Sequence, residues 1–231
     1  MIRSLKEAVR SLARYSSLVG RLAYGQRSFA QEGEDRILTR YFGNRNAGFY
    51  VDIGAHHPFR FSNTALLYRN GWHGINADAW PGSMLPFRRA RSRDVNLEIG
   101  VGKENGTALF YIFNDPAMNT FDPEVAKRHN RAPWYIERTI DVPVRSLAAI
   151  LDEFAPADRQ IDLFSIDVEG KDLEVLESND WTRFRPNMVL FEAIGGALDS
   201  LSNDPIAIFL KQQGYAPYAK TVNTFFFSRQ D

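Results

Sequence analysis

The amino-acid sequence predicts a doubly wound α/β domain with a mostly parallel sheet. Its 231 residues include 44% hydrophobic side chains and 17 phenylalanines, which is enough apolar surface for one core. Short apolar runs that end in Asp or Gly alternate with segments of helical periodicity, as in βα units. The chain contains no internal repeat and no low-complexity tract. These observations together favour one doubly wound domain.

The predicted strands are short apolar runs bounded by turn-forming residues. The first, at 49–54, ends in Asp52 and Gly54 and is expected to be buried in the sheet. The others are expected at 74–78, 95–99, 108–113, 139–144, 161–167, 188–192 and 224–227.

The predicted helices rest on apolar residues at three- and four-residue spacing. One covers 146–154 and begins at Ser146 or the preceding Arg145, its expected N-cap. A second follows the strand at 161–167 and runs through 173–176. A third covers 205–213 and is closed by a glycine.

The charges are distributed unevenly along the chain. Lys and Arg number 28, as do Asp and Glu, so the formal net charge is zero. Residues 1–27 carry six basic side chains against the single acid Glu7, a net charge of +5, while residues 28–231 carry 22 basic and 27 acidic ones, a net charge of −5. This neutral balance argues against a surface built for nucleic acid, so no nucleic-acid partner is expected.

Residues 1–27 are predicted to form a basic amphipathic leader, separate from a domain at 28–231. Apolar residues recur there on one helical stripe, with Arg and Lys on the other faces. The stripe favours either a helix that meets anionic lipid or an acidic partner, or a helix packed on the domain. No apolar run is long enough to span a bilayer, and no signal-peptide core is present. The expected location is cytoplasmic, with peripheral contact at the inner face of the membrane left open.

Acidic residues fall at the carboxyl ends of three of the predicted strands. They are Asp52, Asp78 and Asp167, and parallel sheets bind ligands beyond the carboxyl ends of their strands. Singly, each can equally be a helix cap, but together they favour a nucleoside ligand, with Asp78 placed for ribose hydroxyls. The loop after Asp52 lacks the G-x-G-x-x-G pattern of dinucleotide sites, which argues against a nicotinamide-dependent oxidoreductase. An adenosine ligand without phosphate, such as S-adenosylmethionine, fits better. The absence of cysteine excludes disulfides, zinc–cysteine sites and a thiol nucleophile.

Several motifs together resemble the FkbM family of S-adenosylmethionine-dependent methyltransferases. They are FAQEGED at 29–35, FYVDIGAHHP at 49–58, SNT at 62–64, GWHGI at 71–75, VPVRSL at 142–147, SIDVEG at 165–170 and LEVL at 173–176. The resemblance runs from about residue 28 to the C-terminus and leaves the leader uncovered. It implies a Rossmann-like class I methyltransferase fold: a seven-stranded, mostly parallel sheet with an antiparallel C-terminal strand, flanked by helices. It also implies O-methylation of hydroxyl groups on the sugars of surface glycans or on natural products.

The same resemblance assigns residues to the cofactor. Asp52 and Gly54 would hold its methionine part, Asp78 the ribose, and the segment at Asn96 with the turn near Gly100 the adenine. Gln31, Glu34 and Asp35 match a signature that would close over the cofactor, and Asn63 is assigned to it as well. Two positions depart from the family pattern. Many members have Glu where this chain has Asp78, which shortens the reach to ribose, and Lys where it has Ser165, which leaves the site more negative.

Methyl transfer to an alcohol needs an acceptor for the hydroxyl proton. The candidates are Asp167, Glu169, Glu192, His56 and His57, and the assignment favours Asp167, Glu169 and His57. A divalent cation held by Asp167 and Glu169, with Glu192 or His57 as a further ligand, is the alternative, although no metal is predicted.

The acceptor is expected to be a saccharide or a glycosylated small molecule. Arg88, Arg89, Arg91 and Arg93 form either a solvated helix face or a phosphate site beside it. The insertion at 114–138 is expected to form a substrate lid, with Trp134 and Tyr135 either stacked on sugar or packed in the insertion's own core. A non-catalytic module that binds a glycan or a membrane and keeps a vestigial cofactor pocket is the alternative function.

Overall fold

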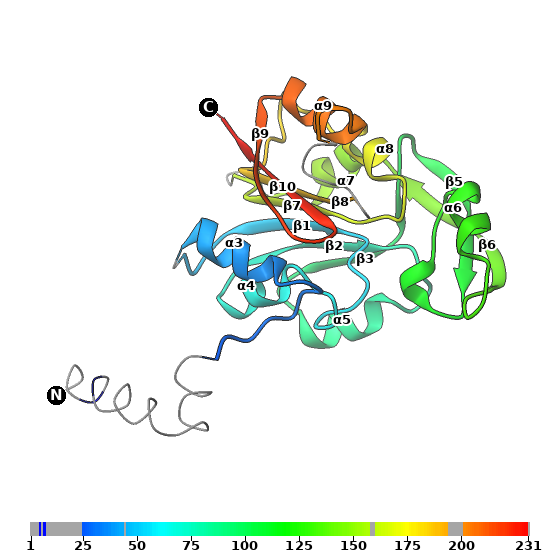
Figure 1. Ribbon diagram of the computed structural model, residues 1–231, viewed down its shortest axis with the longest axis horizontal. Helices are drawn as coiled ribbons and strands as arrows, with labels where there is room; N and C mark the ends of the chain where they lie inside the picture. The colour runs from blue at the N-terminus through cyan, green and yellow to red at the C-terminus, as the bar shows by residue number, and fades with distance from the viewer. Residues whose placement is uncertain are drawn as a thin grey trace.

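The computed structural model describes residues 25–43, 45–157, 160–193 and 201–230, together with Leu5 and Glu7. They form a seven-stranded sheet covered by helices on both faces and a smaller three-stranded sheet at one end (Figure 1). The leader predicted at 1–27 lies mostly outside the described residues.

The large sheet has the strand order β3-β2-β1-β7-β8-β10-β9. It contains β1 (Phe49–Ile53), β2 (His73–Asp78), β3 (Val95–Glu98), β7 (Leu163–Ile166), β8 (Met188–Glu192), β9 (Tyr215–Lys220) and β10 (Thr224–Arg229). Strand β10 pairs antiparallel with both of its neighbours, whereas β3, β2, β1, β7 and β8 pair in parallel. The order reverses between β1 and β7, since β2 and β3 lie on one side of β1 and the later strands on the other. This arrangement confirms the predicted class I fold with its antiparallel C-terminal strand.

Alternation along the strands divides the core between the two faces of this sheet. Phe49, Val51 and Ile53 of β1 pack with α7 (Leu147–Phe154), α8 (Asp172–Glu177) and α9 (Pro205–Gln212) on one face. Tyr50 points the other way and packs with α3 (Glu34–Phe42) and α4 (Ala65–Arg69), near α5 (Met84–Ala90). Figure 1 shows α7, α8 and α9 above the sheet and the other three helices below it.

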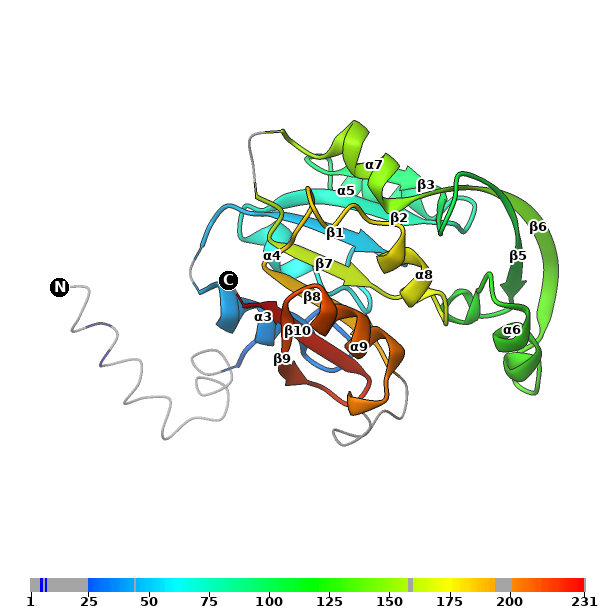
Figure 2. The ribbon, with the colours of Figure 1, turned by 90° about the horizontal axis from the view of Figure 1, so that it is seen from above.

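The second sheet has the order β4-β6-β5 and is made by the segment between β3 and α7, which contains the insertion at 114–138. Its strands are β4 (Gly100–Val101), β5 (Gly106–Phe113) and β6 (Ile136–Arg145), and η1 (Pro116–Met118) and α6 (Pro123–His129) lie between the last two. The strands predicted at 108–113 and 139–144 therefore exist, but they pair with each other away from the large sheet. In Figure 2 this green unit stands beyond one end of the large sheet.

Candidate active site

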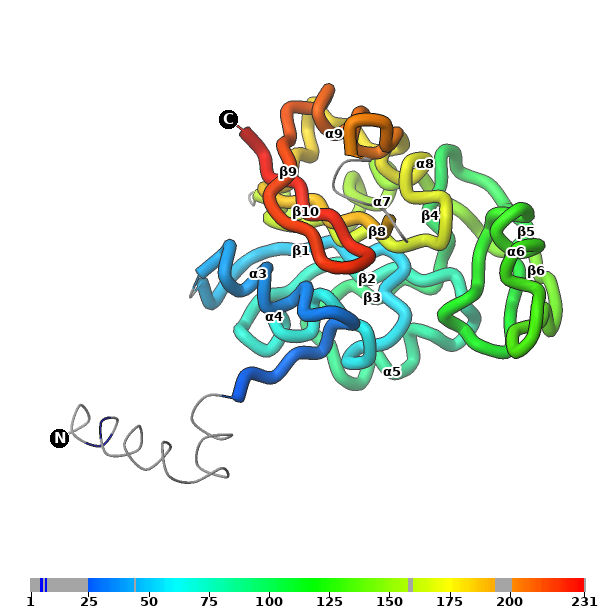
Figure 3. Tube along the Cα trace, viewed as in Figure 1, coloured from blue at the N-terminus to red at the C-terminus, as the bar shows by residue number. Residues whose placement is uncertain are grey.

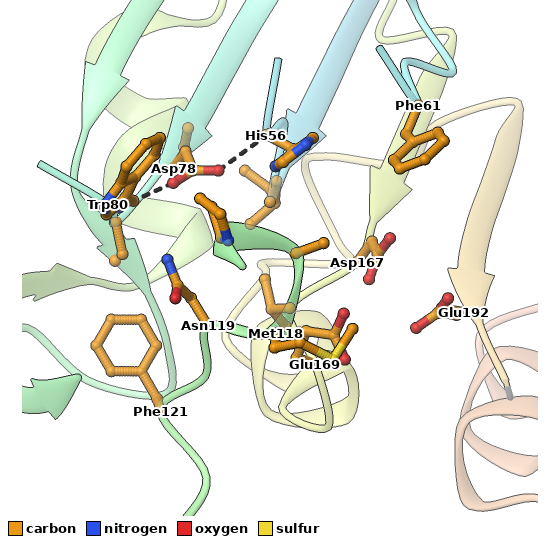
Figure 4. Close-up of a pocket in the computed structure, with 18 of the residues that line it drawn as sticks. His56, Phe61, Asp78, Trp80, Met118, Asn119, Phe121, Asp167, Glu169 and Glu192 are labelled. Atoms are coloured by element: carbon orange, nitrogen blue, oxygen red, sulfur yellow. Dashed lines mark hydrogen bonds between the residues drawn. The ribbon is translucent and has the colours of Figure 1, made fainter. Parts of the chain in front are cut away.

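A pocket of ≈ 390 Å³ lies beyond the carboxyl ends of β1, β2, β7 and β8, next to the point where strand order reverses (Figure 4). This is where open α/β sheets bind ligands. One wall comes from the strand ends and the loop after β1, and the facing wall from the insertion. The lining includes Gln31, Gly54, His56, Arg60, Phe61, Asp78, Trp80, Ile99, Phe110, Asp115, Met118, Asn119, Phe121, Asp167, Glu169, Glu192 and Asn223.

The turn after β1 brings two strand ends into direct contact. Gly54 has φ +78°, and a Cβ placed on it would lie 1.7 Å from the backbone oxygen of Asp167. The Gly54 N–H donates to Ala77 O on β2 at 2.9 Å. Only glycine fits where this turn passes the backbone of Asp167. The close contact and the hydrogen bond together fix the ends of β1, β2 and β7 relative to one another.

Asp78 ends β2 and lines one end of the pocket. Its Oδ1 accepts the Trp80 N–H at 2.8 Å and its Oδ2 accepts the His56 N–H at 2.9 Å. Burial raises the pKa of Asp78, and the two backbone donors oppose that rise. Each oxygen keeps a second lone pair, so a carboxylate held in this way can accept further hydrogen bonds from ligand hydroxyls.

An apolar slot adjoins Asp78. Figure 4 shows Trp80, Asn119 and Phe121 gathered beside it, and the rings of Phe110 and Phe121 lie 4.5 Å apart. Aromatic walls with one amide suit a planar base with polar edges. The slot is formed in part by β5 and the segment after η1. The acidic residues at the strand ends therefore could not predict it.

Three carboxylates meet on the opposite side of the pocket. One oxygen from each of Asp167, Glu169 and Glu192 lies within 4.8 Å of the others, and Figure 4 shows the three side chains converging. Asp167 Oδ1 is buried and has no hydrogen-bond partner among the described residues. Such a cluster can either share protons or hold a divalent cation.

Burial and mutual repulsion make these carboxylates hold protons more tightly than ordinary ones. Burial, and then the Glu192 charge, raise the pKa of Asp167 well above its usual value. The pKa of Glu169 rises to about 9 through burial and the Asp167 charge. For Glu192 the pKa rises to about 7, through burial and the neighbouring Asp172. The cluster therefore carries protons at neutral pH.

Backbone strain is concentrated at this pocket. Among the described residues, the non-glycine residues with positive φ are His56 (φ 53°), Phe61 (φ 55°) and Glu169 (φ 53°). All three line the pocket. Non-glycine side chains in this conformation are held by the surrounding structure at some cost, and such positions gather at functional sites.

The chain matches the methyltransferase FkbM domain over residues 52–217, more than two thirds of its length. It belongs to the FkbM methyltransferase family. Its cofactor is therefore S-adenosylmethionine, as the motifs implied. No curated protein matches the chain.

Three of the solved structures that are similar to this FkbM protein are methyltransferases of low sequence identity. Precorrin-6y C5,15-methyltransferase from Geobacter metallireducens has 14% identity and a TM-score of 0.45, with 89% of this chain and 92% of that one covered. A TehB-like methyltransferase from Corynebacterium glutamicum has 9% identity and a TM-score of 0.41, with 97% and 99% covered. An O-methyltransferase from Bacillus cereus in complex with SAH has 12% identity and a TM-score of 0.43, with 98% and 91% covered.

The pocket of this FkbM protein fits the cofactor. Asp78 would hold the ribose hydroxyls, the apolar slot the adenine, and the turn at Gly54 the methionine part. S-adenosylmethionine carries a cationic sulfonium, and the acidic lining complements that charge. The buried, unpartnered oxygen of Asp167 is consistent with a cation nearby.

Of the assigned cofactor residues, Gln31, Gly54 and Asp78 line the pocket, whereas Glu34 and Asp35 lie behind it. Glu34 is buried and its Oε1 accepts the Thr221 hydroxyl at 2.7 Å. Asp35 accepts the Ser28 hydroxyl and the Phe29 N–H, both at 2.7 Å. Both therefore fix the segment that carries Gln31 rather than contact the pocket.

Asp52, Asn63 and Asn96 also lie outside the lining. Asp52 is buried and accepts the Thr64 hydroxyl at 2.6 Å. Asn63 donates to the Ser165 hydroxyl at 3.1 Å, and Asn96 donates to the backbone oxygen of Arg91 at 3.1 Å. Their contacts hold the loop after β1 and the start of β3, which places them as supports of the site.

The two adjacent histidines occupy different places. His57 Nδ1 accepts the N–H groups of Phe59 and Arg60 at 3.1 and 3.0 Å, so it caps the loop and lies outside the pocket lining. His56, the less favoured candidate, lines the pocket instead. This geometry does not support a catalytic role for His57. The sequence could not separate them because the positive φ of His56 decides which ring faces inward.

The four arginines at 88–93 form no single surface. Arg91 is fully buried and donates to Pro58 O, Ser62 Oγ and Thr64 Oγ1 at 2.6 Å each. Its hydrogen bonds therefore hold the loop after β1 in place, and the buried guanidinium cannot contact a phosphate.

The insertion contributes a wall to the pocket through residues 115–121, and its role as a substrate lid stays a prediction. Trp134 and Tyr135 lie outside the lining. Within the described residues, no helix is long and apolar enough to cross a membrane.

Proposed function

We propose that this FkbM protein methylates a hydroxyl oxygen of a saccharide. The proposal rests on the cluster of Asp167, Glu169 and Glu192 beside the turn at Gly54. An alcohol must lose its proton as it accepts a methyl group, and a carboxylate with a raised pKa is a stronger base than an ordinary one.

Within the cluster, we assign the role of general base to Glu192. Its pKa of about 7 leaves much of it ionised at neutral pH while keeping its basicity above that of an exposed carboxylate. Glu169, with a pKa of about 9, is largely protonated there and can donate a hydrogen bond. The bound cofactor supplies the activated methyl group. The cluster orients the acceptor oxygen and takes up its proton.

The pocket rim supports a saccharide acceptor. Phe61 is 42% exposed, its ring is stacked with His56 at 6.1 Å, and the Arg60 guanidinium lies 4.4 Å from its centre. The exposed part of this ring shares the pocket lining with the carboxylates and with the amides of Gln31 and Asn223, which together offer an apolar contact and partners for sugar hydroxyls.

The test combines cofactor binding with methyl transfer. S-adenosylhomocysteine should raise the melting temperature of wild type, Asp167→Asn and Glu192→Gln alike. Transfer of labelled methyl to glycan fractions should fall by about 10²-fold or more in Glu192→Gln. Mass spectrometry of the product should place the methyl on a sugar oxygen. A methylated nitrogen or carbon, or full turnover by Glu192→Gln, would overturn the proposal.

Two further outcomes separate the alternatives. Loss of turnover with a chelator, restored by a divalent cation, would show that the acidic cluster acts through a metal. Cofactor binding without transfer to any glycan fraction would favour the non-catalytic module.

A further inference from the structure

Exposed cationic and aromatic side chains lie together beside the pocket mouth. Three exposed arginines, Arg27, Arg60 and Arg69, gather there around Phe29, Phe59 and Phe61. We call these six residues the Arg/Phe surface. It joins two segments far apart in sequence, because the Ser62 N–H donates to Phe29 O at 3.0 Å. Figure 3 shows the blue segment at 25–31 running beside the cyan loop after β1.

The arginines rest on aromatic rings and not on carboxylates. The guanidiniums of Arg27 and Arg69 lie 4.7 and 5.4 Å from the centre of the Phe29 ring. That of Arg60 lies 4.4 Å from the Phe61 ring. None of the three forms an ion pair with an acidic side chain in the described part of the chain. Their charges are therefore available to an outside partner.

The acids of the same segment turn inward. Glu32 accepts the Asn223 N–H at 2.8 Å, Glu34 accepts the Thr221 hydroxyl, and Asp35 accepts the Phe29 N–H. The segment thus separates its charges, with carboxylates bound inside and guanidiniums outside. Phe59 and Phe61 are each 42% exposed between those guanidiniums. Exposed rings set among cations are the combination that membrane-surface proteins present to anionic lipid.

We propose that the Arg/Phe surface docks on a bilayer that contains anionic phospholipid. Its charge complements phosphate headgroups, and Phe59 and Phe61 can enter the headgroup region. The chain before it adds to this charge, since residues 1–26 carry five basic side chains against one acidic side chain, a net charge of +4. A nucleic acid, which arginines and aromatic rings can also bind, is the competing outcome that the test below includes.

Docking would place the pocket mouth at the bilayer, since Arg60 and Phe61 belong to both the Arg/Phe surface and the pocket lining. The acceptor would then be a glycan anchored to lipid, a consequence that rests on the proposed function. The docking itself does not rest on it.

Vesicle sedimentation of the full chain tests the docking. Wild type should bind vesicles of phosphatidylcholine with phosphatidylglycerol and should not bind vesicles of phosphatidylcholine alone. High salt should release the bound protein. Each cation near an anionic surface contributes about fivefold to partitioning, so Arg27→Gln/Arg69→Gln should bind roughly 25-fold more weakly. Phe59→Ser should also weaken binding. The control Arg128→Gln/Arg138→Gln removes the same charge from exposed positions on α6 and β6 and should bind as wild type does.

The melting shift with S-adenosylhomocysteine shows whether each variant is folded and whether the cofactor site is intact. Equal vesicle binding by Arg27→Gln/Arg69→Gln and its control would overturn the proposal, as would binding to neutral vesicles or to single-stranded RNA in place of anionic ones. A missing melting shift in wild type would count against the proposed function and leave the vesicle result standing on its own.

Discussion

At the scale of the residue, the site shows which chemistry a strand-end acid performs. Asp52 lies near the end of β1, Asp78 ends β2 and Asp167 follows β7. Their environments differ: Asp52 accepts a buried hydroxyl, Asp78 accepts two backbone N–H groups at the pocket, and Asp167 belongs to the carboxylate cluster. Sequence places such acids at one edge of the sheet because parallel strands share their carboxyl ends. It cannot tell which of them faces the ligand, since that depends on loops whose positive φ values redirect neighbouring side chains.

The role of Asp78 gives a prediction. Asp78→Asn keeps the shape but loses the charge and half of the acceptor capacity, so S-adenosylhomocysteine should bind about 10- to 100-fold more weakly, as expected for loss of a hydrogen bond to a charged group. Titration calorimetry measures this. Glu98→Gln is the matched control, because Glu98 is the exposed register partner of Asp78 on β3. Equal affinities in the two variants would remove Asp78 from the cofactor site.

At the scale of the element, sequence predicts the buried strands and the edge strand β3, but it does not predict the edge strand β9. Strands β1, β2, β7 and β8 are buried on both faces, so they appear as short, mostly apolar runs. Strand β9, with the sequence YAPYAK, was not predicted, because an edge strand can contain Pro217 and leave several side chains exposed. The short β4 has two residues, too few for any pattern. The pocket wall from the insertion was predicted only as a cover, since its register depends on long-range contacts.

The turn after β1 gives an element-scale prediction. In Gly54→Ala a new methyl group would lie 1.7 Å from Asp167 O, so either β1 or β7 must shift. We expect a loss of more than about 4 kcal/mol in the free energy of unfolding, or no soluble protein. Gly82→Ala is the control: its φ is +87° but nothing lies within 4 Å, so it should lose about 1–2 kcal/mol. Urea unfolding of both variants makes the comparison, and similar midpoints would contradict the tight crossing.

At the scale of the whole molecule, the zero net charge divides into parts with separate tasks. Residues 28–231 carry −5, and several of those acids line the pocket that holds a cationic cofactor. The arginines near the pocket mouth lie outside that lining, apart from Arg60. Five ionised carboxylates in one pocket lower the free energy of unfolding when no cation is bound, because burial and mutual repulsion both oppose ionisation.

That cost should appear in the pH dependence of stability. Glu192 and Glu169 have folded pKa values of about 7 and about 9 against an ordinary 4.5, so the folded state holds more protons than the unfolded state. Stability from these groups is complete below pH 4.5 and is lost as pH rises to about 9. Below pH 6.5 the lowered pKa values of His56, His57 and His129 work in the opposite direction. The free energy of unfolding of the cofactor-free protein should therefore fall between pH 6.5 and 9.

Glu169→Gln removes one of the ionising groups, so the free energy of unfolding of this variant should fall less steeply with pH. The variant should be more stable than wild type at pH 9. Urea midpoints measured across this range decide the matter, with the exposed Glu104→Gln expected to follow wild type. A wild-type profile that stays flat or rises would mean that the three carboxylates are not buried together.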